Sequence, residues 1–252
     1  MTQFSDHLRL WRRARRFSQL DLALEANVSA RHISFLETGR ARPSREMIVQ
    51  LSDALAVPLS GRNQMLGAMG FAARYQARDW DEVEMAPIRR AIDRTLQHHA
   101  PYPGIAIDRL WRLTRMNRPA QEMFGMFGLV EGGSMLELLR NPMLWDVVEN
   151  WPEVAYNSML RLRTESAAQG GVSELEAAAD FLAEHARVGT NSSPTVPTVF
   201  RFGDQRLAMF GTIAQFGTPE DTALEELKIE LFFPSDAETE HALEAMFGGL
   251  GK

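Results

Sequence analysis

The stretch between Ser29 and Gly39 brings together side chains that can contact the edges of DNA bases. At the 100° per residue of an α-helix, one side of it carries a cation, two hydroxyls and an aromatic ring: Arg31, Ser34, Thr38 and Phe35. In a major groove, arginine binds guanine acceptors, hydroxyls bind several bases, and apolar groups contact the thymine methyl. An exposed phenylalanine on such a face is costly unless a partner covers it. The pattern predicts a helix that reads duplex DNA.

A purely structural interpretation of the same residues stays open. Arg31 and His32 would then be solvated, and Phe35 would pack on a neighbouring helix. On either interpretation, Ile33 and Leu36 form the buried face of the helix.

Local signals place this helix second in a pair. It begins at Ser29 and ends before a glycine, with Pro43 beyond. The helix before it begins at Ser18, and Asp21 follows three residues later, which is a capping-box pattern with aspartate in place of glutamate. Two helices joined by the turn "ANVS" fit a helix-turn-helix. Further helical patterns on both sides predict five short helices within residues 4–71, which make a compact all-α bundle.

The charge of the chain is unevenly distributed. Residues 1–70 contain ten arginines, no lysine and six acidic residues, which gives about +4. The remainder has 17 basic and 27 acidic residues, so it is about −10, and the whole chain is −6. This asymmetry indicates two modules, of which the basic one is suited to nucleic acid.

The composition excludes several protein classes. The 252 residues are 45% hydrophobic and 24% charged, which is ordinary for a globular protein with one or two domains. There is no cysteine, so the chain has no disulfide framework and no thiolate metal site. No apolar run approaches the roughly 18 residues of a membrane span, and the N-terminus lacks the apolar core of a signal peptide. We expect a cytoplasmic protein with no membrane partner.

The helix pair resembles the helix-turn-helix of the Xre family, which includes Cro and the phage repressors of the lambda type. The matching residues lie in "SQLDLALEANVSARHISFLETGRARPS". The resemblance implies that the helix after the turn is the recognition helix and that Arg12 pairs with Glu37 in the interior. One departure is Arg16, which stands where the family often has glycine. The expected DNA-contacting residues are Gln19, Ser29, Ala30, Arg31, His32, Ser34, Phe35, Arg40 and Arg42. Of these, Gln19 suits a phosphate or a base edge, and Arg40 and Arg42 suit phosphates.

The second part of the chain changes its hydrophobic period. Residues 72–98 are interpreted as a linker and a connecting helix, whose apolar stripe at Met85, Ile88, Ile92 and Leu96 is either core or a dimer seam. Strand patterns follow at 105–113 and 227–233, with a hairpin that turns at 203–205. Helices are expected at 119–127, 134–149, 152–168 and 173–187, a loop at 189–198, and a closing helix at 236–247. We therefore predict an α+β domain with an antiparallel sheet over 99–252.

Nearly the whole chain resembles Xre-type regulators that carry a MmyB-like ligand-binding domain. The most specific segments are "PYPGIAIDRLWRLTRMNRPAQEMFG", "NWPEVA" and "FGTPEDTALEELKIELFFPSD". The resemblance implies a PAS-like second domain, a sheet flanked by helices, that senses a small apolar ligand such as a fatty acid. We expect a bacterial transcription regulator that is dimeric, because two linked units on half-sites about one DNA turn apart multiply a weak single-domain affinity. An alternative is that the second domain only dimerises or binds a protein partner.

Large apolar side chains supply candidate ligand contacts in the second domain, since aromatic and methionine side chains form adaptable pockets. The expected ligand-binding residues are Trp111, Asn117, Phe124, Trp145, Trp151 and Phe210. Arg161 and Arg163 are further polar candidates for a ligand head group, because arginine binds a carboxylate in bidentate fashion. The structural alternative is that the apolar residues are ordinary core.

Enzymatic residues do not assemble into a recognisable pattern. The pair His98–His99 has no cysteine and no suitably spaced carboxylate for a metal site. There is no Gly-x-Ser-x-Gly elbow and no phosphate-binding glycine loop, and "GGLGK" at 248–252 lacks the helix that would follow such a loop. We expect a non-enzymatic protein without a metal or a resident cofactor. The sequence leaves the operator, the target genes, the sign of regulation and the ligand open.

Overall fold

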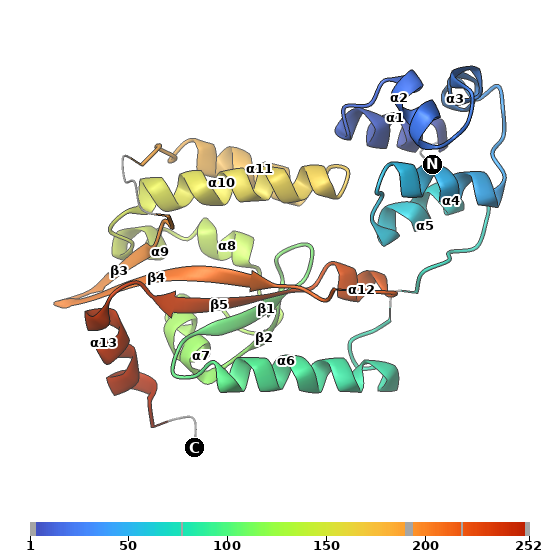
Figure 1. Cartoon of the computed structure of the whole chain (residues 1–252). Helices are drawn as coiled ribbons and strands as arrows, with labels where there is room; N and C mark the ends of the chain where they lie inside the picture. Colours follow the sequence, from blue (N-terminus) through green and yellow to red (C-terminus); the bar gives the residue numbers. More distant parts are fainter. Residues whose placement is uncertain (1–3, 77, 190–193, 218, 250–252) are drawn as a thin grey trace. The chain divides into compact units, whose positions relative to one another are not determined.

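The computed structural model describes residues 4–76, 78–189, 194–217 and 219–249. It divides into two compact units. The first holds residues 1–77 and includes two later segments, 164–172 and 218–225; the second holds the rest. The domain limits expected at residues 71 and 98 stay predictions. Figure 1 shows a helical first unit and a second unit built around a sheet.

Five short helices form the N-terminal part of the first unit, as the sequence predicts. They are α1 Phe4–Ala14, α2 Gln19–Glu25, α3 Ala30–Glu37, α4 Arg45–Ala54 and α5 Leu59–Ala68. Serine caps begin three of them, because the hydroxyls of Ser18, Ser29 and Ser44 accept the backbone N–H groups that lack partners at a helix start. The capping box is present in both directions between Ser18 and Asp21.

The first unit encloses one apolar core. Its largest fully buried side chains include Leu8, Trp11, Leu22, Ile33 and Leu36. Arg16 adopts a left-handed backbone with φ of 58°, the conformation that glycine adopts without strain. Arginine thus holds the conformation that glycine favours, at the position where the family often has glycine.

The second unit is built around a five-stranded antiparallel sheet, whose strand order is β2-β1-β5-β4-β3. The strands are β1 Gly104–Ile107, β2 Leu113–Met116, β3 Thr198–Phe202, β4 Gln205–Ala214 and β5 Lys228–Pro234. The predicted hairpin is confirmed: Phe202 pairs with Gln205 across a turn in which Gly203 has φ of 62°. Helices flank the sheet, so the predicted α+β class is confirmed, while the narrower PAS-like description stays a prediction.

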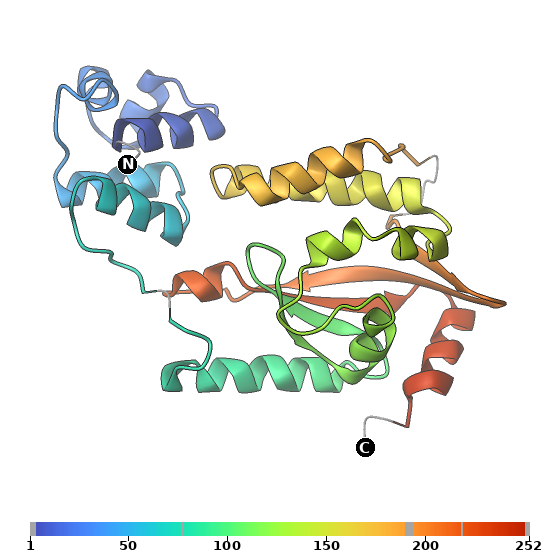
Figure 2. The same cartoon turned by 180° about the vertical axis from the view of Figure 1, so that it is seen from behind.

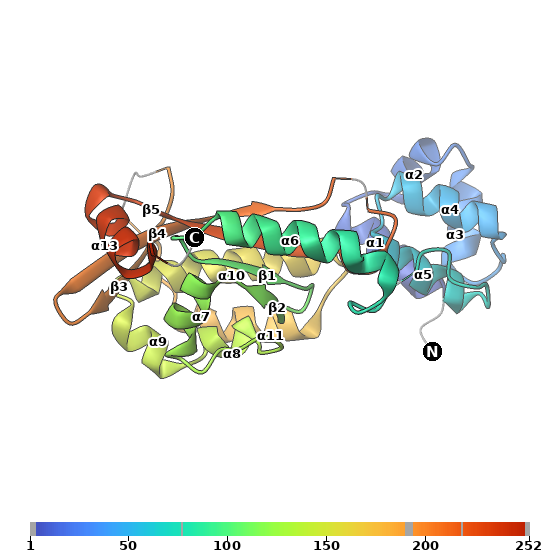
Figure 3. The ribbon, with the colours of Figure 1, turned by 90° about the horizontal axis from the view of Figure 1, so that it is seen from below.

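Two groups of helices cover opposite faces of this sheet (Figures 1 and 3). On one face lie α6 Ala86–His98 and α13 Ala237–Phe247. On the other lie α8 Met135–Leu139, α9 Pro142–Val147, α10 Trp151–Ala168 and α11 Ser173–Ala183, which Figure 2 shows from behind. The remaining elements are α7 Arg118–Gly125, which follows β2, the 3-10 turn η1 Val83–Met85, and α12 Thr222–Glu225 in the first unit.

The apolar stripe of α6 belongs to the core. Ile92 and Leu96 are fully buried and pack with Ala106 of β1 and Ile229 of β5. Of the two interpretations of this stripe, the structure therefore supports core packing.

Two segments depart from the predicted elements. Residues 105–113 are not one strand, because β1 ends at Ile107 and the carboxylate of Asp108 accepts from the N–H groups of Leu110 and Arg112 in a tight loop. The helix expected over 134–149 is divided into α8 and α9. Pro142 cannot continue a helix that precedes it, and it begins α9 instead, with Asn141 as the cap. Parts of two other expected segments, 190–193 and 250–252, lie outside the described residues.

Candidate DNA-reading helix and ligand cavity

Helix α3 separates a buried face from an accessible one. Ile33 and Leu36 are buried in the core, whereas Arg31 is exposed and Ser34 and Phe35 are half-buried. The guanidinium carbon of Arg31 lies 5.2 Å from the centroid of the Phe35 ring, within the range of a cation–π contact. Phe35 is therefore partly covered by its own helix, and the pair presents a joined cationic and aromatic surface.

The hydroxyls that flank α3 have local roles. The Ser29 hydroxyl accepts from the N–H of His32, which caps the helix, and the Thr38 hydroxyl donates to the carbonyl of Ser34. Ala30 is half-buried against the core. Ser29 thus has a structural role whatever it contacts.

Glu37, the last residue of α3, links this helix to α1 and α2. Its carboxylate accepts from Arg12 Nε at 2.6 Å, from Arg12 Nη2 at 3.0 Å and from Gln19 Nε2 at 2.7 Å. Burial alone would raise the pKa of Glu37, but the hydrogen bonds from Arg12 and Gln19 and the charges of Arg12 and Arg9 outweigh it, so this pKa lies below its usual value. The pair that the family resemblance implies is present. The sequence did not indicate that Gln19 would join it.

Two arginines follow α3. Arg40 is exposed, and its backbone N–H donates to the carbonyl of Phe35. Arg42 is also exposed and reaches the carbonyl of Met69 with Nη2 at 3.4 Å. Both stay accessible beside the recognition-helix candidate.

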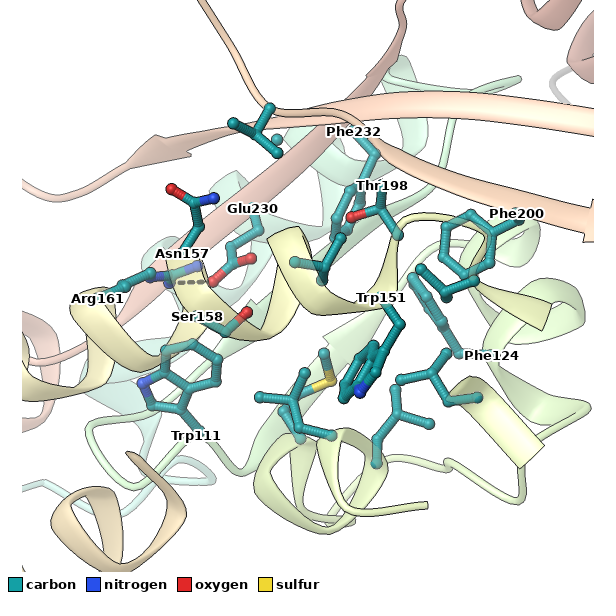
Figure 4. Close-up of a pocket in the computed structure, with 18 of the residues that line it drawn as sticks. Trp111, Phe124, Trp151, Asn157, Ser158, Arg161, Thr198, Phe200, Glu230 and Phe232 are labelled. Carbon is teal, nitrogen blue, oxygen red and sulfur yellow. Dashed lines mark hydrogen bonds and ion pairs between the residues drawn. The ribbon is translucent and has the colours of Figure 1, made fainter. Parts of the chain in front are cut away.

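A cavity of about 350 Å³ lies within the second unit, between the sheet and helices α8, α9 and α10. Its wall is largely apolar, and Figure 4 shows Phe124, Trp151, Phe200 and Phe232 around it. Three of the six predicted ligand-binding residues line it: Trp111, Phe124 and Trp151. A mostly apolar, partly enclosed cavity of this size is suited to a small organic ligand.

The other three predicted residues do not line the cavity. Asn117 is buried, where its side chain bonds the N–H groups of Gly104 and Ala120 and the carbonyls of Leu96 and Tyr102. Trp145 stacks behind Trp151 at 5.6 Å between ring centroids. Phe210 alternates with the cavity-lining Gly211 along β4, so it faces the opposite side of the sheet, where it stacks on Phe233.

Polar residues occupy one part of the cavity wall. Arg161 of α10 forms an ion pair with Glu230 of β5, and the guanidinium lies 4.4 Å from the ring centroid of Trp111. Asn157 and Ser158 stand one turn before Arg161 on the same helix (Figure 4). Arg163, the other arginine proposed for a head group, is exposed and pairs with Asp180 instead.

Comparison with known families matches two parts of the chain. Residues 88–246 match the ligand-binding domain of MmyB-like transcription regulators, and residues 8–61 match a helix-turn-helix family. The chain belongs to the MmyB-like transcription regulators. It is thus a DNA-binding transcription regulator with a ligand-binding domain. A comparison with curated proteins finds no match.

Within this MmyB-like chain, the histidine pair has no metal-site geometry. His98 ends α6, and His99 Nε2 lies 2.8 Å from the carbonyl oxygen of Phe232. Burial lowers the pKa of His99 more than its contacts with the carbonyls of Phe232 and Pro103 raise it. Across the described residues, no group of three or more metal-ligating side chains gathers, and no helix is long and apolar enough to cross a membrane.

Sequence reasoning missed several cavity residues, above all Glu230, Phe200 and Phe232. One signal for Glu230 was present, since a carboxylate in the middle of a mostly apolar strand is unusual. The alternation of Leu227, Ile229 and Leu231 identified only the face that packs on α6. Because β5 is the central strand, its other face is covered as well.

Proposed function

We propose that this MmyB-like regulator binds a two-fold operator as a cytoplasmic homodimer, with α3 in the major groove, and that a small, largely apolar ligand in the second-unit cavity modulates this binding. The observation that carries the proposal is the accessible face of α3, where Arg31 covers Phe35 above a helix anchored by Glu37. A rigidly held helix with a free cationic and aromatic face is suited to base edges.

The residues of the first unit divide into two proposed roles. Arg31, Ser34 and Phe35, with Ala30 and His32 beside them, are proposed to face the bases. Arg40 and Arg42, with Ser29 at the start of α3, are proposed to lie towards phosphates, and Gln19 towards a phosphate or a base edge. Base contacts specify a sequence, whereas phosphate contacts position the protein on any duplex. The two groups therefore predict different mutant behaviour.

A dimer is proposed on physical grounds. A single helix-turn-helix unit has limited affinity, and two linked units on half-sites about one DNA turn apart multiply it. A ligand would then act by preferring one of two arrangements of the dimer, since it shifts their balance only by its differential affinity for them.

A second candidate function is an interaction module without a ligand. The aromatic cavity beside a polar wall argues for the sensing role, because an interaction module needs no enclosed space of this kind. Native mass spectrometry of the full chain after exposure to lipid extract separates the two. A reproducible small adduct supports sensing, whereas none across many lipid classes supports the interaction module.

The DNA-binding proposal is tested by comparing two arginine substitutions on a DNA fragment that the full chain selects from random sequence. Arg31→Ala should weaken binding to the selected fragment more than to random DNA. Arg40→Ala should weaken both about equally and make the affinity less dependent on salt. Equal losses for Arg31→Ala on both DNAs would assign it to phosphate contact alone.

A further inference from the structure

The charged part of the cavity wall is internally balanced. Among the cavity-lining side chains that the structure describes, one is a cation and one an anion, Arg161 and Glu230. They form an ion pair with each other, as the dashed line in Figure 4 shows. Their opposite charges cancel, so the wall offers neither an unpaired cation for an anionic head group nor an unpaired anion for a cationic one.

Both members of the pair are held in place. The Glu230 side chain is 8% exposed on the central strand β5, and the Arg161 side chain is 27% exposed on α10. The guanidinium also lies over the indole of Trp111, so it has an aromatic partner as well as a carboxylate partner. Lys228 precedes Glu230 by two residues on the same strand, but it does not line the cavity.

A carboxylate ligand would meet an electrostatic obstacle at this wall. To bind Arg161, its head group would have to lie beside Glu230, and two like charges in a poorly solvated site repel strongly. Displacing Glu230 instead would leave a buried carboxylate without its partner. A neutral head group avoids both costs, and it finds hydrogen-bonding partners in Asn157, Ser158 and Thr198, which share the cavity wall.

We infer that the cavity selects uncharged amphiphiles, which are mainly apolar molecules whose head is a neutral hydrogen-bonding group such as a hydroxyl or an amide. This inference rests on the proposed ligand-sensing function and narrows its ligand class. It departs from the fatty acid implied by the family resemblance, which is an anion at neutral pH.

The test compares ligands that share one chain and differ in the charge of the head: decan-1-ol, decanoate and decylammonium. Binding to the full-length protein is followed by tryptophan fluorescence, because Trp111 and Trp151 line the cavity. Decan-1-ol should bind about tenfold or more tightly than either ion. Decanoate or decylammonium binding as tightly as the alcohol would overturn the inference and leave ligand sensing intact. Failure of all three to bind would count against ligand sensing itself, and the inference would fall with it.

Two variants reverse the expected preference. Glu230→Gln removes the negative charge and should turn the preference towards decanoate, while Arg161→Met should turn it towards decylammonium. Asp180→Asn is the matched control, because it removes a carboxylate from the exposed pair with Arg163, outside the cavity. Circular dichroism checks that each variant is folded, and if neither cavity variant folds, the ranking of the three ligands on the unaltered protein decides. A folded Glu230→Gln protein that still prefers the alcohol by the same factor would contradict the role given to the ion pair.

Discussion

Arg12 donates to both carboxylate oxygens of Glu37, which lies 25 residues later in the chain, with Nε 2.6 Å from Oε1 and Nη2 3.0 Å from Oε2. The same guanidinium donates through Nη1 to the carbonyl of Phe17 at 2.7 Å. One arginine thus connects α1, the turn that leads into α2, and the end of α3. The orientation of the recognition-helix candidate depends on this pair.

Removing one partner of the pair should destabilise the first unit strongly. The Glu37 side chain is 3% exposed and that of Arg12 is 13% exposed, so Arg12→Ala would leave a buried carboxylate without its cation. We expect a loss of about 3–5 kcal/mol in the free energy of unfolding, measured by urea denaturation. The control is Arg9→Ala, which breaks the exposed pair with Asp6, removes only the smallest of the charge effects on Glu37 and should cost less than about 1 kcal/mol. Equal costs for the two variants would contradict the assigned role of Glu37.

The depressed pKa of Glu37 also sets the sign of a pH effect. A carboxyl with a lower pKa in the folded state binds fewer protons there than in the unfolded chain. Its contribution to stability is present above the ordinary carboxyl pKa of about 4.3 and is lost as the pH falls through the lowered folded value. Urea midpoints taken at falling pH should therefore drop less steeply for Glu37→Gln than for the unaltered protein. The same slope in both proteins would refute this assignment.

Gly39 should resist substitution for a conformational reason. It follows α3 with φ of +71°, and a Cβ added there would meet nothing within 4 Å, so the cost of Gly39→Ala is backbone strain without a clash. We expect Gly39→Ala to lower the free energy of unfolding by about 1 kcal/mol, measured by thermal or urea denaturation. Gly67 is a matched control of opposite sign, since it lies inside α5 with equal space around its Cβ. Gly67→Ala should stabilise by about 0.5–1 kcal/mol, as alanine does in a helix; a gain at Gly39 as well would show that its φ is not limiting.

Asn117 should prove structural. Its amide makes four hydrogen bonds at the start of α7, two as acceptor and two as donor. Asn117→Asp keeps the shape but cannot donate to the carbonyls of Leu96 and Tyr102, so we expect a loss of about 2–4 kcal/mol in stability. Asn157→Ala, at the exposed end of the cavity wall, should instead change decan-1-ol affinity with little effect on stability. A loss of ligand affinity without a loss of stability in Asn117→Asp would restore the original ligand role.

Features encoded locally were the ones that the sequence predicted well. Three such features depend on neighbours only a few residues apart. They are the serine caps, the end of α3 before a glycine and the tight turn of the β3–β4 hairpin. The loop between β1 and β2 was missed because it holds no glycine or proline and turns through Trp111, which has φ of 59°, rare for an aromatic residue. The alternation of apolar residues over 105–113 instead predicts one continuous strand.

The cavity depended on long-range pairing, which local patterns do not specify. Arg161 and Glu230 are 69 residues apart, and they meet because β5 is inserted between β1 and β4 at the centre of the sheet. Phe210 and Phe232 are both aromatic strand residues, yet only the second lines the cavity. Which face of a strand is the cavity face follows from its register, and a shift of one residue would exchange the two.

The most direct test of DNA reading by α3 is selection of binding sites from random DNA by the full-length chain and by Phe35→Ala. The control is Val83→Ala, which truncates an apolar side chain that is 82% exposed outside the first unit. The unaltered chain and the control should enrich the same motif of two related half-sites, and Phe35→Ala should lose the preference at one position within each half-site. Enrichment of an identical motif by Phe35→Ala, or of no motif by the unaltered chain, would contradict the assignment of α3 as the helix that reads the operator.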